Sequence, residues 1–204
     1  MDAVVWSDYI CPWCYVGLDR TALLEARGVR VRPLPFELHP ELPPEGLSIT
    51  GTRPGGRTAV LYDRIAAECE AVGLPFRRPD RVPNSRRALE TAVIVERLSP
   101  DAFLAFHRRL FDAHFVEGLP IDDPDVLAGL VAEAGTDPAP VAEAWEAGVA
   151  AGVLDATREA AYDAGASGTP SWLIEGRALI AGLQPRDRYE RVVDRLLAGQ
   201  RAEP

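Results

Sequence analysis

A short apolar run opens the chain. Residues 3–6 read Ala-Val-Val-Trp, and the polar residues Ser7 and Asp8 follow. β-Branched and aromatic side chains in such a run predict a buried strand. A second strand is indicated over 29–38, where apolar and charged residues alternate until the phase shifts after Pro33. We expect a bulge or an edge position there, because proline cannot donate a ladder hydrogen bond.

The segment between these two strands has a helical pattern. Apolar residues punctuate it from Pro12 onward, and it ends at Gly28, which is a typical stop signal for a helix. Strand, helix and strand together predict a βαβ unit at the start of the chain.

A block of helices is predicted in the middle of the chain, after a connection over 40–56 that is rich in Pro, Gly and Thr. Apolar residues recur at helical spacing, as in Leu61, Ile65, Cys69 and Val72. The expected helices span 57–72, 85–98, 101–115, 123–134, 140–147 and 151–164. Asn84 is the expected N-cap of the second of them.

Strand patterns return near the end of the chain. Residues 165–170 have the composition of a loop, and 171–174 and 178–181 predict a β-hairpin before an amphipathic helix over 187–197. The chain is therefore predicted to be an α/β protein with the order βαβ, helical insertion, ββα. We assign 1–50 and 165–204 to one discontinuous domain and 51–164 to an inserted helical domain.

Composition narrows the functional classes. The 204 residues, with 47% hydrophobic and 26% charged side chains, are typical of a folded globular protein. A net charge of -9 argues against a nucleic-acid partner, which requires basic residues to neutralise phosphates. No apolar run approaches the length of a membrane span, and the N-terminus lacks the features of a secretory signal. We therefore expect a cytoplasmic protein without a membrane partner.

Two of the three cysteines form a Cys-Pro-Trp-Cys motif, Cys11 to Cys14. A cysteine at the start of a helix has a stabilised thiolate, because unpaired backbone N-H groups and the positive end of the helix dipole face it. Pro12 suits the first helical position. We therefore predict that Cys11 is the nucleophile and that Cys14, one turn further in and more buried, resolves a mixed disulfide on Cys11.

Two other interpretations of the cysteines are weaker. A zinc site would have to recruit Cys69 and a histidine from distant segments, and an inert core pair is less common than a redox pair at this spacing. Cys69 itself lies on an apolar helical stripe and is expected to be an inert core residue.

Three stretches carry a family resemblance: residues 8–17 (DYICPWCYVG), 35–41 (PFELHPE) and 168–172 (GTPSW). With the order of elements, they resemble the thioredoxin fold of the DsbA-like oxidoreductases, in particular the FrnE-like branch. The resemblance covers nearly the whole chain. It implies that a cis-proline, Pro170, lies opposite the cysteines and that the backbone of Thr169 pairs with an extended substrate. Pro12 and Trp13 would then contribute to the substrate surface.

The expected activity is that of a protein thiol-disulfide oxidoreductase or isomerase, acting on a disulfide- or thiol-containing protein or on a small thiol. No cofactor or metal is required, although glutathione is a candidate co-substrate. The alternative is a glutathione-dependent isomerase or transferase, because the same fold with a helical insertion resembles the kappa-class transferases and 2-hydroxychromene-2-carboxylate isomerases. A third interpretation, an accessory protein with a vestigial cysteine pair, has no positive support in the sequence.

Further polar residues have two interpretations each. Asp8 and Glu37 are candidates for tuning the pKa of the thiols. The alternative for Asp8 is a solvated residue at the end of a strand, and the alternative for Glu37 is the outward face of an edge strand. Arg86 and Arg87 are candidates for binding an anionic thiol, although a solvated helix face is favoured. Two histidines, His107 and His114, are interpreted as surface or packing residues.

Overall fold

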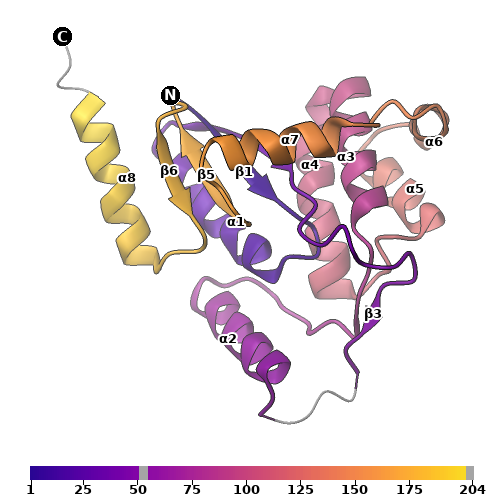
Figure 1. The fold of residues 1–204 in the computed structure, drawn as a ribbon, viewed down its shortest axis with the longest axis horizontal. Helices are drawn as coiled ribbons and strands as arrows, with labels where there is room; N and C mark the ends of the chain where they lie inside the picture. The colour runs from indigo at the N-terminus through magenta and orange to yellow at the C-terminus, as the bar shows by residue number, and fades with distance from the viewer. Residues whose placement is uncertain (51–54, 201–204) are drawn as a thin grey trace.

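A four-stranded sheet lies at the centre of one half of the molecule in the computed structural model, which describes residues 1–50 and 55–200 (Figure 1). Its strands are β1 (Asp2–Ser7), β2 (Arg30–Pro35), β5 (Ser171–Ile174) and β6 (Ala178–Ala181), in the order β2-β1-β5-β6. β1 and β2 are parallel, whereas β5 runs antiparallel to both β1 and β6.

The βαβ unit is confirmed, with α1 (Pro12–Glu25) between β1 and β2. The register of the two strands is continuous from the pair Asp2 and Arg30 to the pair Ser7 and Pro35. β2 is an edge strand. Pro33 has no backbone N-H, and at an edge position no neighbouring strand needs one from it. Of the two interpretations of Pro33, the edge position is therefore right and the bulge is wrong.

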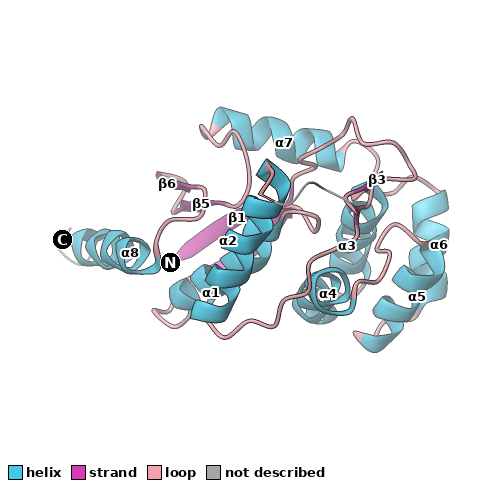
Figure 2. Cartoon of the chain, turned by 90° about the horizontal axis from the view of Figure 1, so that it is seen from below, coloured by secondary structure: helices cyan, strands magenta, loops and turns pink. Residues whose placement is uncertain are grey.

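Helices cover both faces of the sheet (Figures 1 and 2). On one face α1 and α8 (Arg186–Gln200) pack against alternate strand residues, including Val5 and Trp172. On the other face α7 (Val153–Asp163) packs through Ala161 against Trp6 and Phe36. The period of two along each strand thus sends successive side chains into two separate cores.

The predicted helical block is present. It consists of α2 (Arg57–Ala71), α3 (Arg86–Leu98), α4 (Pro100–Asp112), a π-helical turn η1 (Ala113–Glu117), α5 (Pro124–Glu133) and α6 (Pro138–Glu146). None of the described helices combines the length and the apolar character that a membrane crossing requires. A two-stranded sheet of β3 (Leu47–Ser48) and β4 (Arg81–Val82) was not predicted, because two residues per strand are too few to show an alternation.

The start of α3 differs by one residue from its prediction. Ser85, not Asn84, occupies the N-cap, and its side chain makes no capping bond. The Asn84 Oδ1 atom accepts the hydrogen bond of the Arg86 backbone N-H at 3.0 Å, while the Ser85 hydroxyl donates to Asp8. Ser85 is thereby directed toward the cysteine loop.

The inserted helices share their core with the start of α1. One continuous cluster of buried side chains includes Cys11, Cys14 and Tyr15 together with residues of α2 to α6. In addition, α7, which the predicted boundary places in the insertion, covers the sheet. The α/β order with inserted helices is confirmed, and the two parts meet at the cysteine motif.

Candidate active site

The first turn of α1 positions the cysteine pair. Cys11 is the N-cap residue in an extended conformation, without a side-chain capping bond, and Pro12 is the first helical residue, as predicted. The Cys11 backbone N-H donates to the Asp8 carbonyl at 3.1 Å, and the Cys14 N-H donates to the Cys11 carbonyl at 2.9 Å. The helix therefore begins at the motif and directs its N-terminal dipole at Cys11.

Both thiols are free and equally buried. Cys11 and Cys14 each expose 3% of their surface. The expectation that Cys14 is the more buried of the two is wrong, because both cysteines belong to the buried cluster that the start of α1 shares with the inserted helices. Trp13, between them, is half-buried.

The pKa values of the two thiols are displaced in opposite directions. The pKa of Cys11 is lowered, chiefly by a hydrogen bond from the Cys14 side chain, against the effect of burial. The pKa of Cys14 is raised well above its ordinary value, first by burial and then by its hydrogen bond with Cys11. Cys11 is consequently the thiol that ionises first.

The loop before β5 closes the site from the opposite side. The peptide bond between Thr169 and Pro170 is cis, and the Cys11 Sγ atom lies 3.7 Å from the Thr169 carbonyl oxygen. The Thr169 hydroxyl is buried without a hydrogen bond of ordinary geometry in the described part of the chain, but its proximity lowers the pKa of both thiols. Residues far apart in sequence thus meet at the Cys11 sulfur.

Asp8 is fully buried beneath the motif. Its carboxylate accepts hydrogen bonds from the backbone N-H groups of Ile10 and Leu38 at 3.2 and 2.8 Å and from the Ser85 hydroxyl at 3.0 Å. Burial nevertheless raises its pKa to about 6. A negative charge on Asp8 raises the pKa of Cys11, so this side chain is electrostatically coupled to the site and is not a solvated strand end.

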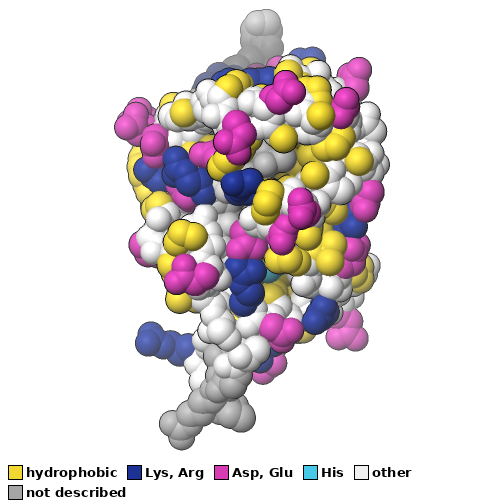
Figure 3. Space-filling model, turned by 90° about the vertical axis from the view of Figure 1, so that its right-hand side faces the viewer, with side chains coloured by type: hydrophobic (Ala, Val, Ile, Leu, Met, Phe, Trp, Pro, Cys, Tyr) yellow, Lys and Arg dark blue, Asp and Glu magenta, His cyan; other side chains and the backbone are white. Residues whose placement is uncertain are grey.

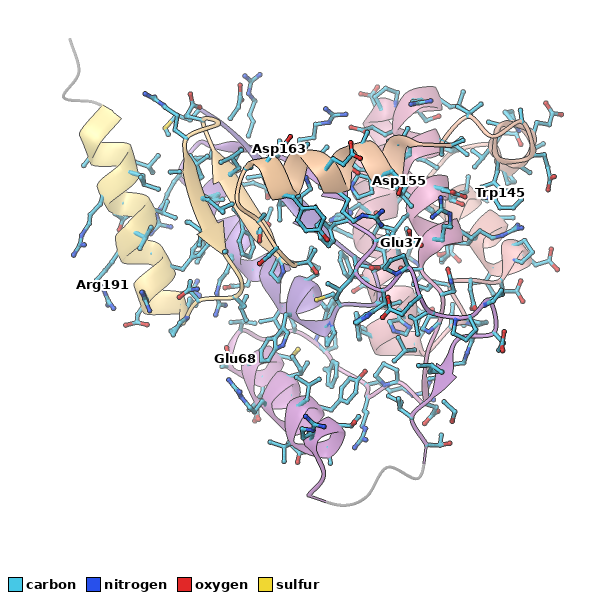
Figure 4. All side chains as sticks on the ribbon, viewed as in Figure 1. Glu37, Glu68, Trp145, Asp155, Asp163 and Arg191 are labelled. Atoms are coloured by element: carbon cyan, nitrogen blue, oxygen red, sulfur yellow. The ribbon has the colours of Figure 1, made fainter. Side chains whose placement is uncertain are left out.

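Glu37 is a buried acid, only 2% exposed, that lies beyond the end of β2 (Figure 4). Its Oε2 atom is 2.9 Å from Arg86 and 3.9 Å from Arg158. Burial raises its pKa, and the two arginines oppose this shift. Glu37 therefore forms ion pairs with α3 and α7, and its charge reaches the site by raising the pKa of Asp8.

A groove of about 430 Å³ opens beside the cysteine motif. Trp13 and Thr169 line it, together with three polar residues, Arg64, Glu68 and Gln184. The Arg64 guanidinium carbon lies 5.6 Å from the centre of the Trp13 ring. None of these three polar residues was singled out from the sequence, where Arg64 and Glu68 have the spacing of an ordinary solvated helix face.

The remaining candidates lie elsewhere. His107 and His114 are buried packing residues, and the His107 Nδ1 atom is 2.9 Å from the Tyr9 hydroxyl. Cys69 is a buried core residue, as predicted. Arg87 stacks on a tryptophan and does not line the groove. Among residues 1–50 and 55–200, no three His, Cys, Asp or Glu side chains are grouped as a metal site requires.

The chain is similar in sequence or in fold to several known proteins. An uncharacterised protein of Bacillus subtilis (strain 168), YwbO, is 28% identical over 193 residues, which are 93% of this chain and 94% of that protein. Among solved structures, the probable DsbA oxidoreductase SCO1869 from Streptomyces coelicolor has a TM-score of 0.84 at 24% identity, covering 97% of this chain and 90% of that chain.

Two further structures share the fold. A 2-hydroxychromene-2-carboxylate isomerase has a TM-score of 0.79 at 19% identity, covering 98% of each chain. The cytosolic disulfide reductase DsbM from Pseudomonas aeruginosa, solved with GSH, has a TM-score of 0.68 at 24% identity, covering 97% of this chain and 100% of that chain.

The family itself is defined by sequence. Residues 3–196, which include the cysteine motif, the helical insertion and the cis-proline loop, match the DSBA-like thioredoxin domain. With the sheet order and the loop geometry described above, this match shows that the chain belongs to the DSBA-like thioredoxin domain family.

Proposed function

We propose that the protein is a thiol-disulfide oxidoreductase or isomerase in which Cys11 is the nucleophile and Cys14 the resolving thiol. The observation that carries the proposal is the position of Cys11 at the N-cap of α1, where its Sγ atom lies 3.7 Å from the Thr169 carbonyl oxygen beside the cis-proline. The Cys14 hydrogen bond lowers the pKa of Cys11 and burial raises that of Cys14, which agrees with these roles. A thiolate is the attacking species in disulfide exchange, and a neutral neighbour does not compete with it.

The reaction needs no other cofactor. The Cys11 thiolate attacks one sulfur of a substrate disulfide, forms a mixed disulfide and releases the other sulfur as a thiolate. Cys14 then loses its proton and attacks the Cys11 sulfur, so that the second substrate thiol leaves and a Cys11–Cys14 disulfide forms. The substrate gains two electrons and the cysteine pair loses two. The reverse sequence oxidises a dithiol substrate.

The substrate would bind against the cis-proline loop. The Thr169 carbonyl lies at the reactive sulfur, where an extended peptide could add main-chain hydrogen bonds. Pro12 and Trp13 would border it on the helix side. The groove beside Trp13 supports glutathione as a candidate co-substrate, and a reducing cytoplasm, where a thiol pair remains reduced, is the proposed compartment.

The test is selective alkylation of the reduced protein with iodoacetamide, followed by mass spectrometry. We expect Cys11 to react first, with a pH midpoint below the ordinary thiol value of about 8.5. Cys11→Ala should abolish reduction of insulin, whereas Cys14→Ala should accumulate a mixed disulfide. Cys69→Ala is the matched control and should retain activity. Full insulin reduction by Cys11→Ala, or faster alkylation of Cys14 than of Cys11, would contradict the proposal.

A second candidate is a glutathione-dependent isomerase, in which the groove beside Trp13 holds the tripeptide and the Cys11 thiolate only orients it. This candidate predicts glutathione binding without electron transfer. Titration of Cys11→Ala and Cys14→Ala with glutathione, alongside the insulin assay, separates the two. Isomerase function predicts that Cys14→Ala retains full isomerase activity, because no mixed disulfide has to be resolved.

A further inference from the structure

A second cavity lies on the helical part of the molecule, away from the thiols. It has a volume of about 170 Å³ and is enclosed by α3, α5 and α6. Leu127, Val131 and Val141 form an apolar floor. Figure 3 views the molecule from the side on which α5 and α6 lie in Figure 1, and hydrophobic side chains gather on this face. The cavity therefore offers an apolar interior that opens to the surface.

The guanidinium of Arg87 lies at the edge of this cavity. The Arg87 guanidinium carbon lies 3.6 Å from the centre of the Trp145 ring, and both residues line the cavity. Arg87 is half-buried, and the ion pairs found among residues 1–50 and 55–200 do not include it. The residue before it, Arg86, pairs with Glu37 and Glu90. A guanidinium over an indole ring can still donate its N-H groups to an anion.

The carboxylate that contacts the Trp145 indole is already engaged. Glu90, one turn along α3, accepts a hydrogen bond from the Trp145 indole N-H at 2.9 Å and pairs with Arg86 at 3.2 Å. Glu90 thus fixes the indole under Arg87 without neutralising Arg87.

Other features of the rim define the charge of a ligand. The N-termini of α5 and α6 reach the cavity through Pro124 and Pro138, but the side chains of Asp123 and Asp137 already accept their backbone N-H groups. Arg87 is therefore the residue at this rim that can donate hydrogen bonds to an anion. Glu146, exposed at the rim, repels any anion, so the site disfavours a ligand with a second negative charge.

We propose that this cavity binds a small monocarboxylic acid whose apolar part is about the size of a benzene ring, with its carboxylate on Arg87. A cavity of about 150 Å³ with apolar walls is large enough to bind benzene, and Arg binds carboxylates through two parallel hydrogen bonds. The proposal concerns a second site and does not rest on the redox function.

The test is titration of the intact protein with phenylacetate. Binding is monitored through the indole N-H signal of Trp145 in ¹H–¹⁵N NMR spectra. The signal is assigned by its loss in Trp145→Phe. We expect it to shift with a dissociation constant of about 1 mM or tighter, the range for a ligand of about ten non-hydrogen atoms. Phenylacetamide, the neutral isostere, should bind about tenfold more weakly because it lacks the charge-assisted bonds.

Two variants test separately the role of the Arg87 guanidinium and the role of the apolar cavity. Arg87→Ala should weaken phenylacetate binding about tenfold or more, and Ala128→Leu should block binding by filling the cavity while leaving Arg87 in place. Arg177→Ala, an exposed arginine in the turn between β5 and β6, is the control and should bind as the unaltered protein does. Equal affinity for the acid and the amide, undiminished binding by Arg87→Ala, or no shift up to about 10 mM overturns the proposal.

Discussion

At the scale of single residues, opposing effects set the acidity of Cys11. The Cys14 thiol lowers the pKa of Cys11 by donating a hydrogen bond, whereas burial and, to a smaller extent, the charge of Asp8 raise it. Asp8 itself has a pKa of about 6, because burial outweighs its three hydrogen bonds. The charge near Cys11 therefore changes in the range between pH 5 and 7.

Replacing Asp8 by Asn should make Cys11 more reactive above pH 6. The substitution removes a negative charge that disfavours the Cys11 thiolate, so the pKa of Cys11 should fall and its pH profile of alkylation should shift to lower pH. The rate of iodoacetamide labelling between pH 5 and 9 measures this shift.

The matched variant is Ser85→Ala. It removes a hydrogen bond that stabilises the Asp8 carboxylate, so Asp8 should remain protonated to a higher pH. We expect the profile of Ser85→Ala to resemble that of Asp8→Asn just above pH 6 and that of the unaltered protein at higher pH. A shift of the Asp8→Asn profile to higher pH would contradict the coupling.

At the scale of elements, α1 approaches the cis-proline loop at Gly17. A Cβ atom there would lie 3.3 Å from the Trp172 ring and 3.4 Å from the Pro170 Cγ atom. Trp172 is fully buried and its indole N-H donates to the Thr21 hydroxyl at 3.1 Å, so the ring has little freedom to move away. This glycine sets the distance between α1 and the cis-proline loop.

Gly17→Ala should therefore destabilise the fold and reduce activity together. The contact with Trp172 and Pro170 opposes the gain in helix propensity of about 1 kcal/mol that alanine normally brings. Gly129→Ala, in α5, is the control because open space surrounds its Cβ position, and it should stabilise the protein by up to about 1 kcal/mol. Urea denaturation measures the free energy of unfolding of both variants. A stabilised Gly17→Ala variant would show that the cis-proline loop moves to make room for the methyl group.

At the scale of the whole molecule, two buried histidines should control stability in acid. Burial lowers the pKa of His107 to about 3 and that of His114 to about 4, whereas an unfolded chain has values near 6.5. The unfolded state therefore binds more protons below pH 6.5, and the free energy of unfolding falls by up to about 1.4 kcal/mol per pH unit for each histidine. Asp8, whose pKa is raised, acts in the opposite direction below pH 6.

Denaturation at pH 7 and pH 5 tests this dependence. His107→Asn keeps an atom that can bond the Tyr9 hydroxyl but does not titrate, so it should lose less stability on acidification than the unaltered protein. An unchanged pH dependence would mean that His107 is not the titrating group. Tyr9→Phe, which leaves the imidazole in place, should keep the full dependence.

The shared core also predicts a single unfolding transition. Side chains of α1 and of the inserted helices belong to one cluster, so the sheet and the helical block should not unfold separately. Trp145, in α6, and Trp172, in β5, report on the two parts. Single-tryptophan variants should give coincident fluorescence midpoints, and two separated midpoints would show that the parts unfold independently.

Much of the fold followed from local patterns. The helix at Pro12, the β-hairpin at 171–181 and the Cys11 to Cys14 motif were recognisable because periodicity, turn residues and spacing are properties of neighbouring residues. β3 and β4 were missed because each is too short for a pattern, and Arg64 and Glu68 because a groove is formed by segments that are distant in sequence.

By itself, the sequence determined the order of elements, the position of the cysteine pair at the start of a helix and the family resemblance. The tertiary structure decided that both thiols are equally buried, that Asp8 is desolvated, that Glu37 pairs with arginines and that Arg87 stacks on Trp145. The physical reason is that helix and strand periodicity depends on adjacent residues, whereas burial and pKa depend on the side chains that folding brings together from distant segments.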